Sequence, residues 1–221
     1  MRLFLRTFTA YLLGVFITGA MLFIPAGTLD YNGAWLFMML LFVPILIVGI
    51  VLLVKNPELL RKRLEMKERE KTQKGVVGLS TLLLIGSFIV AGFDFRHHWS
   101  HVPDTITIAA SVVLLIGYAL YAEVLRENVF LSRVIEVQIG QHVIDTGLYA
   151  IVRHPMYLAV TLIYLSMPLV LGSWWALMVI LPCILLLLVR IKNEEHVLCQ
   201  KLPGYTNYMK RTRYRMIPFV W

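Results

Sequence analysis

Long apolar runs without charged residues constrain this chain more than any other feature. Four of them extend over residues 7–25, 33–54, 75–93 and 105–122. A helix of about 20 apolar residues crosses the hydrocarbon core of a bilayer, so each run has the length of a transmembrane span. A separate soluble catalytic domain does not fit beside them in 221 residues, of which 59% are hydrophobic. The sequence therefore predicts an all-α, polytopic integral membrane protein.

A fifth apolar run, residues 155–189, is too long for a single span. Gly172 and Ser173 interrupt it near the middle, which favours two antiparallel helices joined by a tight turn. Pro155 and Pro168 favour a short or kinked first helix of this pair. We therefore expect five or six transmembrane helices, the last two forming a C-terminal helical hairpin.

The distribution of basic residues predicts the orientation in the membrane. With the N-terminus inside, 20 of the 21 Lys and Arg residues lie on one side, and Arg96 is the exception. Loops rich in Lys and Arg stay in the cytoplasm, so both termini are predicted to be cytoplasmic. The net charge of +8 then reflects topology, and no nucleic-acid partner is expected. The basic segment 55–74 is predicted to be a solvated, helix-prone cytosolic loop.

Metal and disulfide chemistry are not expected. Cys183 and Cys199 fall in no ligand pattern or disulfide framework. His97, His98 and His101 form an HHxxH sequence, but it lies in a short external loop and lacks the helical HExxH arrangement of zinc sites.

Two polar clusters in the second half of the chain carry the candidate functional residues. The first, residues 138–157, reads QIGQHVIDTGLYAIVRHPMY, and the second, residues 190–208, reads RIKNEEHVLCQKLPGYTNY. In the first, the chain before Pro155 must be extended, which leaves free backbone amides and carbonyls at the membrane entrance. Those groups either bind a polar ligand or form an ordinary interfacial turn, with Arg153 reaching out to lipid phosphates.

In the second cluster, Arg190 and Glu194 lie one helical turn apart and share a face. They either form a surface ion pair or bind an anionic and a cationic ligand group, respectively. His142 and His196 are either general bases or solvated histidines. The aromatic and basic tail, residues 205–221, is predicted to be an interfacial helix and membrane anchor.

Taken together, the two clusters resemble the isoprenylcysteine carboxyl methyltransferase family and related membrane methyltransferases. The resemblance covers roughly residues 132–221 and rests on VIDTGLYAIVRHPMYL, RIKNEEHVL and GYTNYMKRTRYRMIP. It implies a cofactor-binding and catalytic region over 132–221, which follows an N-terminal transmembrane region over 1–131 of about four helices. The two regions are expected to form one structural unit.

The resemblance also implies a cofactor and its ligands. S-adenosylmethionine is expected in a pocket at the cytoplasmic face, formed by the last helices and the chain before them. Arg190 would position the acceptor, and Glu194 would bind the cofactor through its side chain. The remaining cofactor contacts implied by the motifs are Gln141, His142, Val143, Ile144, Tyr149, His154, Pro155, Met156 and Tyr157.

Carboxyl O-methylation is the expected reaction. The acceptor would be an isoprenylcysteine-like or other lipophilic carboxylate that enters from the bilayer among the membrane lipids. A carboxylate is already ionised at neutral pH and needs no base, whereas an amine or thiol must lose a proton. The alternatives are a phospholipid N-methyltransferase, a thiol S-methyltransferase, a nicotinamide-dependent membrane reductase and a non-enzymatic membrane protein.

Overall fold

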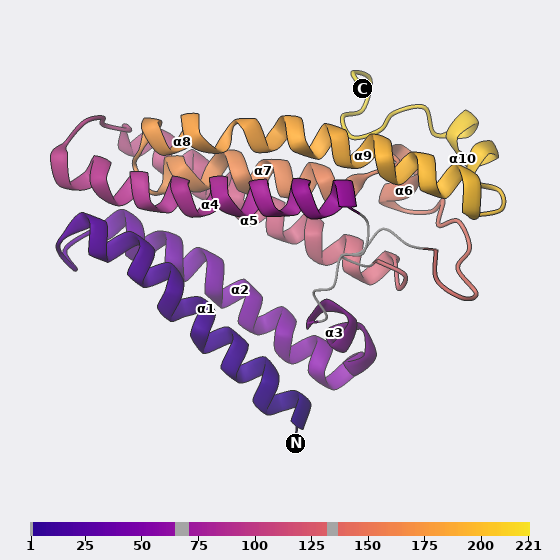
Figure 1. The fold of residues 1–221 in the computed structure, drawn as a ribbon, viewed down its shortest axis with the longest axis horizontal. Helices are drawn as coiled ribbons and strands as arrows, with labels where there is room; N and C mark the ends of the chain where they lie inside the picture. Colours follow the sequence, from indigo (N-terminus) through magenta and orange to yellow (C-terminus); the bar gives the residue numbers. More distant parts are fainter. Residues whose placement is uncertain (1, 65–70, 132–136) are drawn as a thin grey trace.

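The computed structural model describes residues 2–64, 71–131 and 137–221, and all regular secondary structure in these residues is helical (Figure 1). Helices α1 (Arg2–Ala26) and α2 (Asn32–Lys55) form an antiparallel pair joined by a short turn. The charged helix α3 (Pro57–Leu64) follows. It lies within the predicted loop 55–74, of which residues 65–70 are outside the described residues.

The next two helices are α4 (Lys71–His97) and α5 (Asp104–Glu127). In the part of the chain that the structure describes, five helices are long and apolar enough to cross a membrane. Four of them correspond to the four charge-free runs and extend one to five residues beyond each end of the run. The prediction of an all-helical, multi-pass membrane protein is confirmed.

The predicted C-terminal hairpin is also present. Helix α7 (Pro155–Val170) is followed by a turn, and then by α8 (Trp174–Ile180) and α9 (Pro182–Lys201), which form one apolar segment of 28 residues. Gly172 has φ of +79° in the turn, a conformation that glycine adopts without strain. The hydroxyl of Ser173 accepts a hydrogen bond from the backbone of Ala176 and caps α8.

The C-terminal tail differs from the prediction of a single interfacial helix. Helix α10 (Tyr205–Arg211) is short, and the chain after it is irregular and folds back toward the start of α7 (Figure 1). The amides of Arg153 and His154 donate hydrogen bonds to the carbonyls of Tyr214 and Arg215, at 2.9 and 2.7 Å. These tail carbonyls therefore bond to another segment of the chain instead of continuing a helix.

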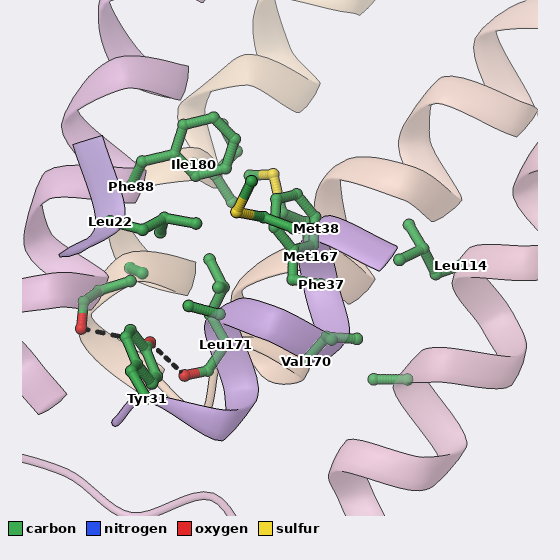
Figure 2. Packing of buried hydrophobic residues seen from close by; sticks show 14 of the residues in the cluster. Leu22, Tyr31, Phe37, Met38, Phe88, Leu114, Met167, Val170, Leu171 and Ile180 are labelled. Atoms are coloured by element: carbon green, nitrogen blue, oxygen red, sulfur yellow. Dashed lines mark hydrogen bonds between the residues drawn. The ribbon is translucent and has the colours of Figure 1, made fainter. Parts of the chain in front are cut away.

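The main hydrophobic core lies toward the end of the bundle that holds the loops 27–31, 98–103 and 171–173. Figure 2 shows Leu22, Phe37, Phe88 and Ile180 meeting there from four different helices. The hydroxyl of Tyr31 donates a hydrogen bond of 2.5 Å to the carbonyl of Leu171 within this core. This end of the bundle is closed by packing, and the polar clusters lie at the opposite end.

Candidate functional site

A pocket lies where α5 and α9 end and α7 begins. Its wall is built from the chain after α5, the segment before and within α6 (Leu148–Ile151), the start of α7, and one face each of α9 and α10. The empty space between these walls is about 850 Å³, a volume that includes the open solvent at the mouth. It is lined by Asn128, Phe130, Leu131, Gln141, His142, Val143, Ile144, Tyr149, Arg153, His154, Met156, Tyr157, Arg190, Glu194, Leu198, Leu202, Tyr205 and Tyr208.

One face of α9 supplies the charged part of the wall. Arg190, Glu194 and Leu198 follow one another at intervals of four residues along α9, and Leu202, which directly follows the helix, continues this row. Tyr157 on α7 connects the two charged members: its buried hydroxyl donates to Oε2 of Glu194 at 2.6 Å and accepts from Nε of Arg190 at 3.0 Å. A guanidinium and a carboxylate are thereby held beside one shared hydroxyl.

A constrained backbone turn positions the opposite wall. Gly147 has φ of 54° and ψ of −127°, a region that side-chain-bearing residues rarely adopt. A Cβ atom at this position would lie 1.6 Å from Oε1 of Glu127. The same carboxylate accepts hydrogen bonds from the amide of Leu148 at 3.0 and 3.2 Å, at the first residue of α6. The glycine in the DTGLY motif therefore lets the end of α5 anchor the chain that leads into the pocket.

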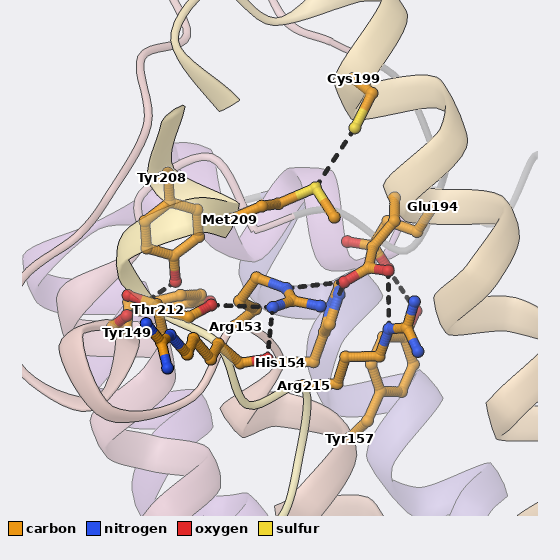
Figure 3. Close-up of polar contacts among 12 residues, drawn as sticks. Tyr149, Arg153, His154, Tyr157, Glu194, Cys199, Tyr208, Met209, Thr212 and Arg215 are labelled. Atoms are coloured by element: carbon orange, nitrogen blue, oxygen red, sulfur yellow. Dashed lines mark hydrogen bonds and ion pairs between the residues drawn. The ribbon is translucent and has the colours of Figure 1, made fainter. Parts of the chain in front are cut away.

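Behind the pocket wall, Glu195 organises a buried ionic cluster. Its Oε1 accepts from Nε of Arg153 at 2.7 Å and lies 3.3 Å from Nε2 of His154, and its Oε2 accepts from Nε of Arg215 at 2.8 Å. Figure 3 labels Arg153, His154 and Arg215, and its dashed lines mark polar contacts of this cluster. The guanidinium of Arg153 also donates to the carbonyl of Thr212 at 2.8 Å. The interpretation of Arg153 as a residue that reaches out to lipid phosphates is wrong, since it is 7% exposed and bonded within the protein.

Three buried tyrosines complete the wall beside α10. The hydroxyl of Tyr208 donates to the carbonyl of Tyr149 at 2.7 Å, which fixes α10 against α6. Burial raises the pKa of Tyr208, and burial together with the charges of Glu194 and Glu195 raises the pKa of Tyr205. Both phenols therefore stay protonated at neutral pH and act as neutral hydrogen-bonding groups.

The structure brings the residues predicted from the two clusters into one place. All of the predicted cofactor contacts except Pro155 line the pocket, and Arg190 lines it as well. Pro155 is the first residue of α7 and sets where that helix begins. Their roles in binding and catalysis stay predictions.

The two candidate bases, His142 and His196, lie in different environments. His142 lines the pocket, whereas His196 is exposed and contacts Gln200 on the outside of α9. Among the described residues, no group of three or more His, Cys, Asp or Glu side chains is arranged to hold a metal ion, and this includes the HHxxH sequence.

Several residues in and behind the pocket wall were given no site role from the sequence. The motif gave a role to Glu194 alone, and nothing in the sequence indicated that the adjacent Glu195 would be buried in an ionic cluster. Tyr205 and Tyr208 were assigned to a membrane anchor. Asn128 and Phe130 follow α5, outside both polar clusters, and Nδ2 of Asn128 donates to the hydroxyl of Tyr149 at 2.9 Å. Only the tertiary structure places Asn128 and Phe130 beside the first motif, and only the packing of α10 against α6 places Tyr205 and Tyr208 in the pocket wall.

The comparison with known protein families gives a match in the second half of the chain. Residues 105–203 match the phospholipid methyltransferase family. The resemblance to membrane methyltransferases is confirmed for these residues. The matched range begins with α5 and extends almost to α10, so it includes the pocket walls formed by the chain after α5 and by α6, α7 and α9.

This match supports a membrane methyltransferase, and the phospholipid methyltransferases are among the activities expected from the sequence. The narrower resemblance to carboxyl methyltransferases stays a prediction, as does the cytoplasmic placement of the termini. No curated protein matches the chain.

Proposed function

We propose that this protein is an S-adenosylmethionine-dependent membrane methyltransferase whose acceptor is a lipophilic carboxylate. The observation that carries the proposal is the arrangement of Arg190 and Glu194 on either side of the Tyr157 hydroxyl, in the wall of one pocket. A carboxylate suits a cationic cofactor, and a guanidinium suits an anionic acceptor. The two partners of a methyl transfer would thus be held side by side.

The residues present fit this cofactor. S-adenosylmethionine, when bound, supplies a methyl group on a sulfonium together with an ammonium and a carboxylate. Glu194 is the carboxylate on the pocket wall that would hold the ammonium. Aromatic rings of Phe130, Tyr149, Tyr157 and Tyr205 also line the pocket, and such rings attract cations through their faces.

Arg190 and Tyr157 would contribute to catalysis mainly by orienting the acceptor relative to the methyl group. Methyl transfer is an in-line displacement, so the acceptor oxygen must lie on the axis of the breaking bond. Arg190 would fix the acceptor carboxylate through its guanidinium, and the Tyr157 hydroxyl holds Nε of that guanidinium at a set distance from Glu194. An ionised carboxylate needs no general base, and a pocket that limits water increases its reactivity.

An apolar cavity offers room for the tail of the acceptor. It lies between α1, α2 and α3 on one side and α5 on the other, and Phe8, Leu46, Leu53 and Leu115 are among its lining residues. Leu125 and Tyr121 of α5 belong both to this cavity and to the hydrophobic cluster that packs against Tyr149 in the pocket wall. We propose that the acceptor tail occupies this cavity and that its head group reaches Arg190.

A second candidate is N-methylation of a phospholipid, and the match of residues 105–203 favours it. Arg190 would then bind the phosphate of the head group. The amine must lose a proton, and His142 is the histidine on the pocket wall with an exposed side chain available for that step. The two candidates differ in the bond that is formed, so the product distinguishes them.

The experiment follows the methyl group into product. Full-length protein in vesicles is incubated with methyl-labelled S-adenosylmethionine and a membrane lipid extract. A carboxyl ester releases labelled methanol in base, whereas an N-methyl lipid keeps its label. Glu194→Gln and Arg190→Ala should each remove most of the incorporation.

The matched controls are Glu123→Gln and Arg126→Ala. These residues form an exposed pair on α5 outside the pocket, and their variants should retain full incorporation. If the wild-type protein neither transfers label nor binds S-adenosylhomocysteine in calorimetry, both candidate functions are rejected.

A further inference from the structure

Tyr205 presents a buried polar atom that the fold does not satisfy. Its side chain is 4% exposed and lines the pocket. Within the described residues, its hydroxyl has no hydrogen-bond partner. Buried polar groups in native proteins nearly always have a hydrogen-bond partner. A buried polar group without one destabilises the fold unless a ligand supplies the partner. An unsatisfied hydroxyl in the wall of a pocket therefore points to a ligand.

The neighbouring residue Tyr208 holds α10 in place against α6. Tyr208 lies one turn further along the same helix, is also buried, and donates its hydroxyl to the carbonyl of Tyr149 at 2.7 Å. The rings of Tyr205 and Tyr208 are 5.7 Å apart. The same helix thus holds one tyrosine that completes the fold and one whose hydroxyl remains for another partner.

The chemical surroundings indicate the kind of group that this hydroxyl would bind. Burial and the charges of Glu194 and Glu195 raise the pKa of this hydroxyl, whereas the charge of Arg153, which also lines the pocket, lowers it, so the hydroxyl lies near groups of both signs. It stays protonated there, so it offers a hydrogen to an acceptor atom. An anionic acceptor is favoured, because hydrogen bonds to charged groups are the stronger ones.

We infer that the Tyr205 hydroxyl donates a hydrogen bond to the amino-acid carboxylate of bound S-adenosylmethionine, an inference that rests on the proposed function. In an amino acid, the ammonium and the carboxylate are attached to the same carbon. A cofactor whose ammonium is bound by Glu194 therefore brings its carboxylate into the same part of the pocket. Tyr205 lies beyond residues 105–203, so the family match does not include it.

The test compares Tyr205→Phe with the full-length wild-type protein in detergent micelles. Binding of S-adenosylhomocysteine is measured by calorimetry, and thermal unfolding is measured without ligand. The variant should bind S-adenosylhomocysteine roughly 10- to 100-fold more weakly, as expected for a lost bond to a charged group. Its unfolding temperature should be unchanged or higher, because an unsatisfied buried hydroxyl has been removed.

A second ligand tests which part of the cofactor is contacted. The compound 5′-methylthioadenosine has the adenosine and the thioether but lacks the amino acid, so its affinity should be the same for both proteins. If Tyr205→Phe weakens both ligands equally, the assignment to the carboxylate is overturned. If the wild-type protein binds S-adenosylhomocysteine and Tyr205→Phe binds it equally well, the inference fails while the proposed function stands.

Tyr31→Phe is the matched control. It removes the same atom from another buried tyrosine, whose hydroxyl is bonded to the Leu171 carbonyl in the main core. This variant should unfold at a lower temperature and keep its affinity for S-adenosylhomocysteine. If the wild-type protein binds neither ligand, the proposed function falls and the inference falls with it.

Discussion

The carboxylate of Glu195 and the guanidinium of Arg215 meet at 2.8 Å, although they are twenty positions apart in the chain. This contact joins the C-terminal tail to α9. The other oxygen of Glu195 bonds to Arg153, which begins the extended segment before α7. One buried carboxylate therefore holds together three segments around the pocket, while the adjacent Glu194 faces into it.

Glu195→Gln should destabilise the protein by about 3–5 kcal/mol, because Arg153 would then be buried without its counterion. The side chains of Glu195 and Arg153 are only 6% and 5% exposed, so water cannot replace the lost charge. Thermal or denaturant unfolding in detergent measures the effect. Glu194→Gln is the matched variant and should lose less than about 1 kcal/mol, with its main loss in cofactor affinity. Equal loss of stability in both variants would contradict the different roles of the two carboxylates.

Gly147→Ala should destabilise the protein by more than about 2 kcal/mol and weaken binding of S-adenosylhomocysteine. The new methyl group would overlap Glu127, and the backbone would be strained at φ of 54°. Gly140→Ala separates these two causes, since Gly140 has φ of 76° but no atom near the position of a Cβ. It should cost only about 1–2 kcal/mol. Similar losses at both positions would show that the overlap with Glu127 is unimportant.

Arg190→Ala should lower kcat/KM for the acceptor by about 10- to 100-fold while the affinity for S-adenosylhomocysteine changes by less than about twofold. The Tyr157 hydroxyl still donates to Glu194 in this variant, so the cofactor side of the pocket keeps its arrangement. Arg190→Lys keeps the charge but loses the planar fork, and an intermediate rate is expected. Steady-state kinetics and calorimetry measure the two effects. A cofactor affinity that falls in parallel with the rate would reject the assignment of Arg190 to the acceptor.

The rate of methyl transfer to a carboxylate should be flat from about pH 6 to pH 8. A carboxyl group with an unperturbed pKa of about 3.5 is fully ionised across that range, so raising the pH adds no further reactive form. An amine acceptor is protonated at the lower pH, and its rate would rise with pH as the reactive neutral form increases. The rate profile of the wild-type protein decides between them. His142→Ala should have little effect on carboxylate methylation and a large effect on amine methylation.

Much of the fold is predictable from the sequence because the bilayer constrains the length and composition of each span, which are properties of consecutive residues. Hydrocarbon thickness sets the length of each apolar run, and a span therefore shows in some twenty consecutive residues. The hairpin after Pro155 is predictable for a similar reason, since Gly172 supplies the turn within the run itself. The tail after Arg211 was predicted wrongly, because its backbone partners are the amides of Arg153 and His154, about sixty residues earlier.

The sequence by itself determined the helical membrane architecture and identified the residues that gather around the pocket, since hydropathy and motifs are local properties of the chain. Only the tertiary structure showed that Glu195, next to the predicted Glu194, is buried in an ionic cluster. It also showed that Arg153 is internal, and that the Tyr205 hydroxyl is left without a partner among the described residues. The physical reason is that burial and hydrogen bonding depend on the segments that surround a side chain, and these come from distant parts of the sequence.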